Sequence, residues 1–300
     1  MSLVSLANSR LGPPIGIAAV GLLPRGFAYR LGEWIARRVA AGEGPLPSAV
    51  RLNQAVVRGM DPHDPALHRA VEVVLRTAAV GYVDLFKAMA GGPRVLRESC
   101  EVDPQVRAWV EESIRDRRGM IAVSGHLSCF DMILLSLAQY GYPIQGLSYA
   151  QPRGSYLVQN AIRLQHGLDL SPISPQALRK ALHLLKAGGI AMTAVDRPVD
   201  EGELLELFGR PARLPVGHAR LAIMAKARVM VGVCQSLGEG KYRVVPGGLL
   251  DSTKYERHGD GPRRMAQDVL SILEPFIRAR PEEWLMFHPL WPDIRPEPAL

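Results

Sequence analysis

The sequence is poor in cysteine and has no long apolar run. Its three cysteines, Cys100, Cys129 and Cys234, are odd in number and far apart, so neither a disulfide framework nor a zinc-binding CxxC pair is indicated. The apolar stretch at residues 14–23 falls short of the roughly 20 residues that cross a bilayer, and no small-residue cleavage site follows it. We therefore expect a reducing compartment, and neither a signal peptide nor a membrane span.

Motifs for several other chemistries are also missing. No GxSxG nucleophile elbow is present, which argues against an α/β-hydrolase. No second histidine or carboxylate cluster accompanies His126 and Asp131, so a metal-ligand set is incomplete. The arginines are dispersed and no helix-turn-helix or RNA-binding pattern occurs, so nucleic acid is not an expected partner. No internal repeat or long linker divides the chain.

The chain carries an excess of positive charge. Thirty-six Lys and Arg residues against 29 Asp and Glu give a formal net charge of +7. Such a balance favours anionic partners, including phospholipid headgroups and acidic carriers, although it can also serve solubility alone. In RGFAYRLGEWIARRVA, from residue 25, apolar side chains recur at helical spacing among four arginines. This pattern predicts a basic amphipathic helix that either lies on an anionic membrane or packs on the core. The apolar positions are Phe27, Leu31, Trp34, Ile35 and Val39.

The middle of the sequence alternates between strand-like and helix-like segments. Such alternation favours an α/β fold with a central mixed, largely parallel sheet flanked by helices, preceded by an N-terminal amphipathic helical segment. We expect a single domain over 1–300, in which 1–45 is the helical region and 46–300 the catalytic core. The predicted strands are 120–124, 144–149, 190–195 and a hairpin around 229–246. The predicted helices are 66–90, 103–117, 131–141, 155–167, 175–188 and 215–226.

The segment MIAVSGHLSCFD contains the spacing HxxxxD. His126 follows a predicted strand, and Asp131 stands five residues further on. Within one helix this separation leaves the two side chains well apart, at roughly 100° per residue. They meet only if His126 lies at the mouth of a helix and Asp131 on its second turn, which a cap at Ser128 would allow.

In that arrangement the Asp131 carboxylate fixes the imidazole tautomer, and the other ring nitrogen of His126 is a general base. A base of this kind can deprotonate an acceptor hydroxyl for attack on an activated carbonyl such as a thioester, and such a reaction needs no protein nucleophile. Cys129 lies between the two residues but has no clear second base, so we interpret it as a packing residue.

Further blocks of sequence keep the order and spacing of one known family. They are RLNQAVV from residue 51, YLVQNAIRLQHGL, LLKAGGIAMTAVDRP, LFGRPARLPVGHARLAIMAKARVMVGV and PEEWLMFHPLWPDIRP. Together with GHLSCFD they resemble the lysophospholipid acyltransferase superfamily, specifically the branch of lipid A lauroyl/myristoyl acyltransferases and phosphatidylinositol mannoside acyltransferases. Several blocks in one order are far more specific than any single motif.

The resemblance implies an O-acyltransferase that moves a long-chain acyl group from acyl-CoA or acyl-ACP to a hydroxyl of a membrane glycolipid or lysolipid. It implies an α/β fold, an acyl-chain tunnel beside the His and Asp residues, and peripheral attachment to the cytoplasmic face of the inner (plasma) membrane. The expected partners are an anionic membrane surface, the lipid acceptor and the acyl donor. No metal or redox cofactor is implied. A non-catalytic lipid-binding protein and a hydrolase stay open as alternatives.

Carried over residue by residue, the resemblance makes His126 the base and Asp131 its orienting carboxylate. Arg163 matches a position where the family often has an arginine near the reaction centre. Asp196 matches an acidic residue that follows a strand and faces the site. Several relatives carry a second Asp two residues later, where this chain has Pro198.

Each of these residues also has a simpler structural interpretation. Arg163 is either a ligand for a phosphate or oxyanion or part of a surface salt bridge. Asp196 either helps to bind or align a substrate at the site or forms a structural ion pair with Arg197 or another arginine. Arg197 is itself a candidate for substrate binding. Gly217 either turns a helix N-terminus toward the substrate or serves close helix packing.

Four further residues are less convincing candidates. His166 and His218 fall on helical patterns, where isolated histidines are usually surface or satisfied core groups. Trp284 and Trp291 are interpreted as core or interfacial anchors, not as ligand-stacking groups.

Overall fold

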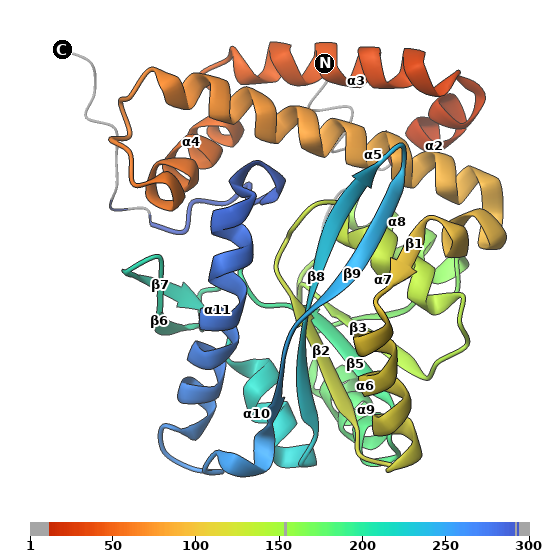
Figure 1. Ribbon diagram of the computed structural model, residues 1–300, viewed down its shortest axis with the longest axis vertical. Coiled ribbons are helices and arrows are strands. Elements are labelled where there is room, and N and C mark those ends of the chain that lie inside the picture. Colours follow the sequence, from red (N-terminus) through yellow and green to blue (C-terminus); the bar gives the residue numbers. More distant parts are fainter. Residues whose placement is uncertain (1–11, 153–154, 292, 294–300) are drawn as a thin grey trace.

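The computed structural model describes residues 12–152, 155–291 and 293. A seven-stranded sheet forms its centre (Figure 1). The strands are β1 (Cys100–Val102), β2 (Met120–Ser124), β3 (Ile144–Ser148), β4 (Asp169–Pro172), β5 (Ile190–Ala194), β8 (Arg228–Gly238) and β9 (Lys241–Asp251). Their order is β1-β9-β8-β2-β5-β3-β4, and every neighbouring pair is parallel except β8 and β9. The prediction of a mixed, largely parallel sheet is confirmed.

Helices flank this sheet, as predicted. They are α2 (Gly12–Leu22), α3 (Arg25–Ala40), α4 (Pro45–Arg58), α5 (Ala66–Glu98), α6 (Pro104–Arg115), α7 (Phe130–Ala138), α8 (Ser155–Gln165), α9 (Pro175–Lys186), α10 (Gly217–Ala225) and α11 (Gly261–Ala279). A separate hairpin joins β6 (Glu203–Leu207) to β7 (Arg210–Leu214). Among the described residues, no helix combines the length and the apolar character that crossing a membrane requires.

The central strand β2 shows why these residues form a buried sheet. Its side chains alternate between two hydrophobic clusters, since successive residues of a strand point to opposite faces. Ile121 and Val123 pack with α9, α10 and α11, whereas Met120 and Ala122 pack with α5, α6 and α7. Because both faces are covered, the strand is almost wholly apolar, as buried parallel strands are.

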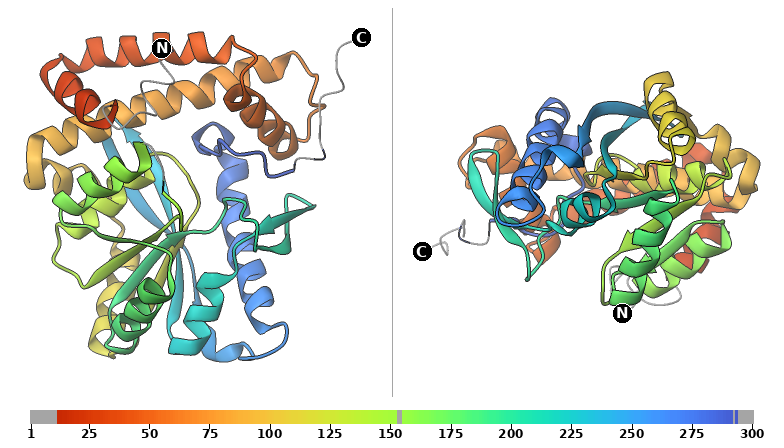
Figure 2. Two further views of the ribbon diagram at one scale, coloured as in Figure 1. Left: turned by 180° about the vertical axis from the view of Figure 1, so that it is seen from behind. Right: turned by 90° about the horizontal axis from the view of Figure 1, so that it is seen from below.

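The N-terminal helices form a layer across one end of the sheet. Figures 1 and 2 show α3 and α5 side by side there, and the two helices pack against each other. Lys87 on α5 donates to the carbonyls of Val20, at 3.0 Å, and Leu23, at 2.6 Å, at the end of α2. Asp84 on α5 accepts hydrogen bonds from Tyr29 on α3 and Tyr242 on β9. Polar contacts therefore join the predicted N-terminal region to the core.

The predicted amphipathic helix exists, but its apolar residues do not share one buried face. Ala28, Ala36 and Ala40 are the buried residues of α3. Phe27, Leu31 and Trp34 remain 54%, 41% and 48% exposed, and Ile35 and Val39 are half-buried. The buried residues of α3 are thus small, and Phe27, Leu31 and Trp34 remain on the outside among the arginines.

Local patterns missed several elements and boundaries. Helix α5 continues eight residues beyond the predicted end at 90, with a kink at Gly92, where φ is +80° just before Pro93. Strands β1 and β4 span only three and four residues, too short for a period to be visible. The hairpin β6–β7 and helix α11 were also not predicted, whereas the β8–β9 hairpin is confirmed.

Candidate active site

His126 lies in a short loop between the carboxyl end of β2 and the start of α7. Two backbone contacts with a distant segment fix this loop. Leu285 N donates to the His126 carbonyl at 2.8 Å, and Ser128 N donates to the Glu283 carbonyl at 2.7 Å. Helix α5 covers the loop from the other side, where Cys129 Sγ lies 3.4 Å from the carbonyl of Gly81. The position of His126 therefore depends on three separate parts of the chain.

The imidazole of His126 is hydrogen-bonded to Asp196. Nδ1 lies 2.6 Å from Asp196 Oδ1, while Oδ2 accepts from the His126 backbone N–H at 2.7 Å and from Trp284 Nε1 at 2.8 Å. Asp196 follows β5, the parallel neighbour of β2, so the two residues emerge at the same edge of the sheet. The Asp196 side chain is fully buried, whereas 21% of the His126 side chain is exposed.

Glycine at position 125 permits this close approach. A Cβ atom there would lie 2.9 Å from Asp196 Oδ2, closer than such atoms normally come. Any side chain at position 125 would therefore push against the carboxylate that holds His126.

The electrostatics keep Asp196 ionised. Burial raises the pKa of Asp196, but the charge of His126 and the hydrogen bonds from His126 and Trp284 together outweigh it, so the pKa lies below its usual value. When His126 is neutral, the ionised carboxylate favours the tautomer with the proton on Nδ1, which leaves a free lone pair on Nε2. This arrangement makes Nε2 able to take a proton from a bound hydroxyl.

Asp131 does not orient His126, and that part of the prediction is wrong. Its Oδ2 instead accepts from Arg163 Nη2 at 2.7 Å. Helix α7 begins at Phe130 with Cys129, not Ser128, at its N-cap, so Asp131 falls in the first turn. His126 lies outside the helix, and its ring packs edge-on against Phe130 with the ring centres 4.8 Å apart.

Arg163 is part of a buried ion pair and not of a surface salt bridge. The side chains of Arg163 and Asp131 are only 9% and 11% exposed. Burial lowers the pKa of Arg163, but the charge of Asp131 and its hydrogen bond more than compensate, so the guanidinium remains charged. Arg163 Nη1 also donates to Asn160 Oδ1 at 2.9 Å. The second oxygen of Asp131, Oδ1, is buried without a hydrogen-bond partner among the described residues.

Arg197 does not pair with Asp196. Its guanidinium carbon lies 4.7 Å from the ring centre of Tyr149, and it forms no ion pair within the part of the chain that the structure describes. Partial burial and the positive charges of Arg197 and His126 lower the pKa of His288. The Arg197 guanidinium and the His126 ring are therefore both near enough to His288 to affect its pKa.

Gly217 starts α10 and is exposed. A Cβ atom there would meet nothing within 4 Å, so close helix packing does not explain this glycine. Its role in substrate binding stays a prediction.

The less convincing candidates have structural roles or none. Burial lowers the pKa of His218 to about 4 and raises the pKa of the Cys129 thiol, so neither group is charged at neutral pH. Burial also lowers the pKa of His166. Trp284 is a core residue as predicted, but its bond to Asp196 was missed. The sequence indicated only that a buried indole N–H usually has a hydrogen-bond acceptor, and it did not identify Asp196 as that acceptor.

Within residues 12–152 and 155–291, no group of three or more His, Cys, Asp or Glu side chains is arranged to hold a metal ion.

The sequence profile of the bacterial lipid A biosynthesis acyltransferase family matches residues 14–293. This span includes His126, Asp131, Arg163, Asp196 and Trp284. A search among curated proteins gave no significant match.

Proposed function

The chain belongs to the bacterial lipid A biosynthesis acyltransferase family, and from this premise we propose its reaction. A long-chain acyl group passes from an acyl thioester, either acyl-CoA or acyl-ACP, to a hydroxyl of a membrane glycolipid or lysolipid. The observation that carries the proposal is the 2.6 Å contact between His126 Nδ1 and the buried Asp196 carboxylate. It supports a general base whose Nε2 is free for the acceptor.

The proposed reaction needs no covalent enzyme intermediate. His126 Nε2 takes the proton of the acceptor hydroxyl while the oxygen bonds to the thioester carbonyl carbon. The tetrahedral oxyanion collapses, the C–S bond breaks, and the thiolate receives the proton from the imidazolium. Asp196 stabilises the imidazolium during both steps. Base catalysis of this kind contributes about 10²–10⁴-fold, and the alignment of two bound substrates supplies much of the remainder.

We assign Arg163 and Asp131 to alignment. Arg163 already donates to Asp131 and Asn160 and is largely buried, so its donors are directed at the protein. The pair joins the first turn of α7, which follows the His126 loop, to α8. The Asp131–Arg163 pair therefore influences the position of His126 through the backbone that connects α7 to the His126 loop.

The surroundings of Arg197 favour an acceptor with a negatively charged headgroup. The charges of Arg197 and His126 both act on the pKa of His288, and the Arg197 guanidinium lies against the ring of Tyr149. A guanidinium is well suited to phosphate oxygens. Replacing Arg197 with Gln should raise the KM for an anionic acceptor and leave kcat nearly unchanged. An unchanged KM would remove Arg197 from the acceptor site.

The outer surface of α2 and α3 supports docking on an anionic membrane. Ile15, Leu22, Phe27, Leu31 and Trp34 are all more than 40% exposed. The exposed arginines of α3 accompany them, which is the composition of helices that bind in the headgroup region. The layer adjoins the carboxyl edge of the sheet, so docking there would bring His126 near lipid acceptors.

The docking can be tested without unfolding the layer. The double variant Leu31→Ser/Trp34→Ser should lose most of its binding to vesicles containing phosphatidylglycerol. Leu237→Ser, which changes an equally exposed leucine on β8 (47%), is the control. Equal binding by both variants and the wild type would refute docking through α3.

The proposed reaction is tested by following free-thiol release from acyl-CoA and acyl-ACP, with and without a total lipid extract. Lipid-dependent release that falls by about a thousandfold in His126→Ala is the expected result. Release that does not depend on lipid would indicate a hydrolase. No release with any donor would indicate a lipid-binding protein without catalysis.

A further inference from the structure

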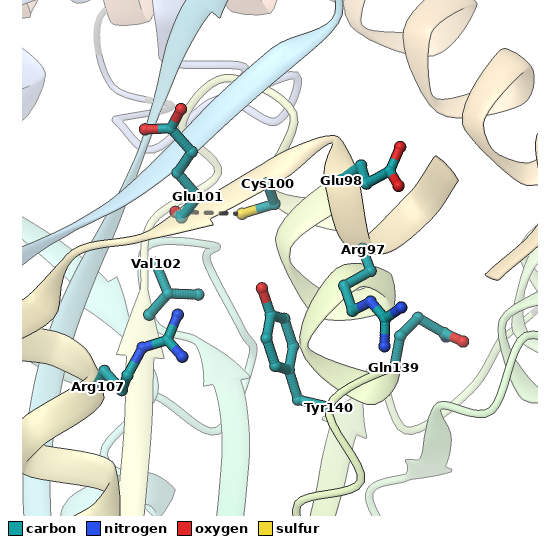
Figure 3. A pocket seen from close by; sticks show the side chains of 8 residues that line it. All are labelled: Arg97, Glu98, Cys100, Glu101, Val102, Arg107, Gln139 and Tyr140. Atoms are coloured by element: carbon teal, nitrogen blue, oxygen red, sulfur yellow. Dashed lines mark hydrogen bonds between the residues drawn. The ribbon is translucent and has the colours of Figure 1, made fainter. Parts of the chain in front are cut away.

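An open cavity of about 730 Å³ lies between the end of α5, strand β1, the start of α6 and the segment after α7 (Figure 3). Its polar lining includes Arg97, Arg107, Gln139 and Tyr140. None of its lining residues belongs to the His126 site. The proposed acyl transfer therefore gives this cavity no role.

Two guanidinium groups and two carboxylates line the cavity, but within the described part of the chain only the carboxylates have ion-pair partners. Among the described residues, Arg97 and Arg107 form no ion pair, and their side chains donate no hydrogen bond. The partners of Glu98 and Glu101 lie outside the cavity. Glu101 accepts from Arg243 at 2.7 Å, and Glu98 lies 3.9 Å from Arg94. Figure 3 shows both carboxylates pointing away from Tyr140, with the two guanidinium groups on either side of its ring.

Aromatic and amide side chains hold the cavity in shape. The guanidinium carbon of Arg107 lies 5.8 Å from the ring centre of Tyr140, which in turn stacks on Tyr142. Gln139 Nε2 donates to the carbonyls of Leu135 and His166, so the segment that carries Tyr140 is fixed. The hydroxyl of Tyr140 has no hydrogen-bond partner within the described chain, and Figure 3 shows it directed into the cavity.

We propose that this cavity binds a phosphate group, which Arg97 and Arg107 contact from two sides and to which Tyr140 donates its hydroxyl proton. Two guanidinium groups match the charge of about −1.5 to −2 that a phosphate monoester carries at neutral pH. Their planar sets of donors suit phosphate oxygens better than a single point charge would. The volume lies in the range of sites for small molecules, about 300–1,000 Å³. The phosphate belongs either to a soluble phosphate ester or to a lipid headgroup.

The probe for this site is inorganic pyrophosphate, titrated calorimetrically into the full chain in phosphate-free buffer. Low ionic strength is needed because exposed charges are strongly screened. We expect saturable binding that Arg97→Gln and Arg107→Gln each weaken by about tenfold. Both side chains are exposed, so neither change should affect folding, and thermal unfolding checks this.

One matched variant serves as the control. Arg115→Gln removes an exposed arginine from the far end of α6, outside the cavity. It should bind pyrophosphate as the wild type does. Absence of pyrophosphate binding, or equal binding by the wild type and the Arg97 and Arg107 variants, would overturn the proposal.

Vesicles then identify the source of the phosphate. Vesicles of phosphatidylcholine with phosphatidic acid are bound less well by Arg97→Gln and Arg107→Gln than by Arg115→Gln if the natural ligand is a lipid headgroup. Equal binding, together with the pyrophosphate result, assigns the site to a soluble phosphate ester.

Discussion

Two buried carboxylates near the His126 loop are used in different ways. Asp196 accepts hydrogen bonds from the His126 ring, the His126 backbone and Trp284. Asp131 accepts from Arg163 through one oxygen, and its other oxygen has no partner among the described residues. Asp196 therefore faces an imidazole, which can be neutral or protonated, whereas Asp131 faces a guanidinium, which stays charged.

This difference separates the chemical step from the framework around it. A carboxylate beside histidine can stabilise a charge that appears only during the reaction. A carboxylate beside arginine compensates a charge that is present throughout. We therefore expect changes at Asp196 to appear in the rate, and changes at Asp131 to appear mainly in stability.

The largest effect on stability is expected for Asp131→Ala. Removal of the carboxylate leaves the guanidinium of Arg163 buried without its partner, which should cost about 3 kcal/mol of unfolding free energy. Urea unfolding measures the loss. The control is Asp169→Ala, which breaks the exposed pair with Lys180 and should cost less than about 1 kcal/mol. A similarly small loss in both variants would contradict a structural role for the Asp131–Arg163 pair.

A smaller effect, on the rate alone, is expected for Trp284→Phe. The variant keeps a large aromatic side chain but removes the hydrogen bond to Asp196 Oδ2, so kcat should fall by about tenfold. Trp291→Phe is the matched control, because that indole is also buried but its Nε1 has no partner among the described residues. Steady-state kinetics compare the two. Equal loss in both would show that Trp284 acts only through packing.

The smallest expected effect is on the pH dependence of stability. The pKa of Asp196 is lower in the folded chain than its ordinary value, so the unfolded chain takes up the proton first as pH falls. The stabilisation is therefore complete above about pH 4 and is lost as pH falls through the folded pKa. In Asp196→Asn, the urea concentration at the midpoint of unfolding should therefore decrease less steeply as the pH falls in the acidic range. An unchanged pH dependence would contradict the lowered pKa of Asp196.

Most of the fold could be predicted from local patterns. Strands β2, β3 and β5 are short apolar runs between helices of regular period, and their parallel arrangement follows from that alternation. The short strands β1 and β4 and the hairpin β6–β7 were not predicted, because few residues in them carry a hydrophobic pattern. The N-terminal helix was predicted, but which of its residues face outward depends on α5.

The candidate site was predicted less completely, because its contacts join distant segments. The HxxxxD spacing located His126, and the family resemblance pointed to Asp196, 70 positions away. Neither could show that these two residues pair, since that depends on β2 and β5 being neighbours in the sheet. The bond from Trp284, 88 positions beyond Asp196, depends on the chain returning to the His126 loop. Local spacing instead suggested Asp131.

The most direct test compares Asp196→Asn with Asp131→Asn in the lipid-dependent thiol-release assay, at equal concentrations of folded protein. Both changes remove one charge and keep the shape of the side chain. We predict that Asp196→Asn lowers kcat by about a thousandfold, as expected when the partner that fixes the histidine tautomer is lost, and that Asp131→Asn stays within about tenfold of the wild type. A loss in Asp131→Asn equal to or greater than that in Asp196→Asn would contradict the account.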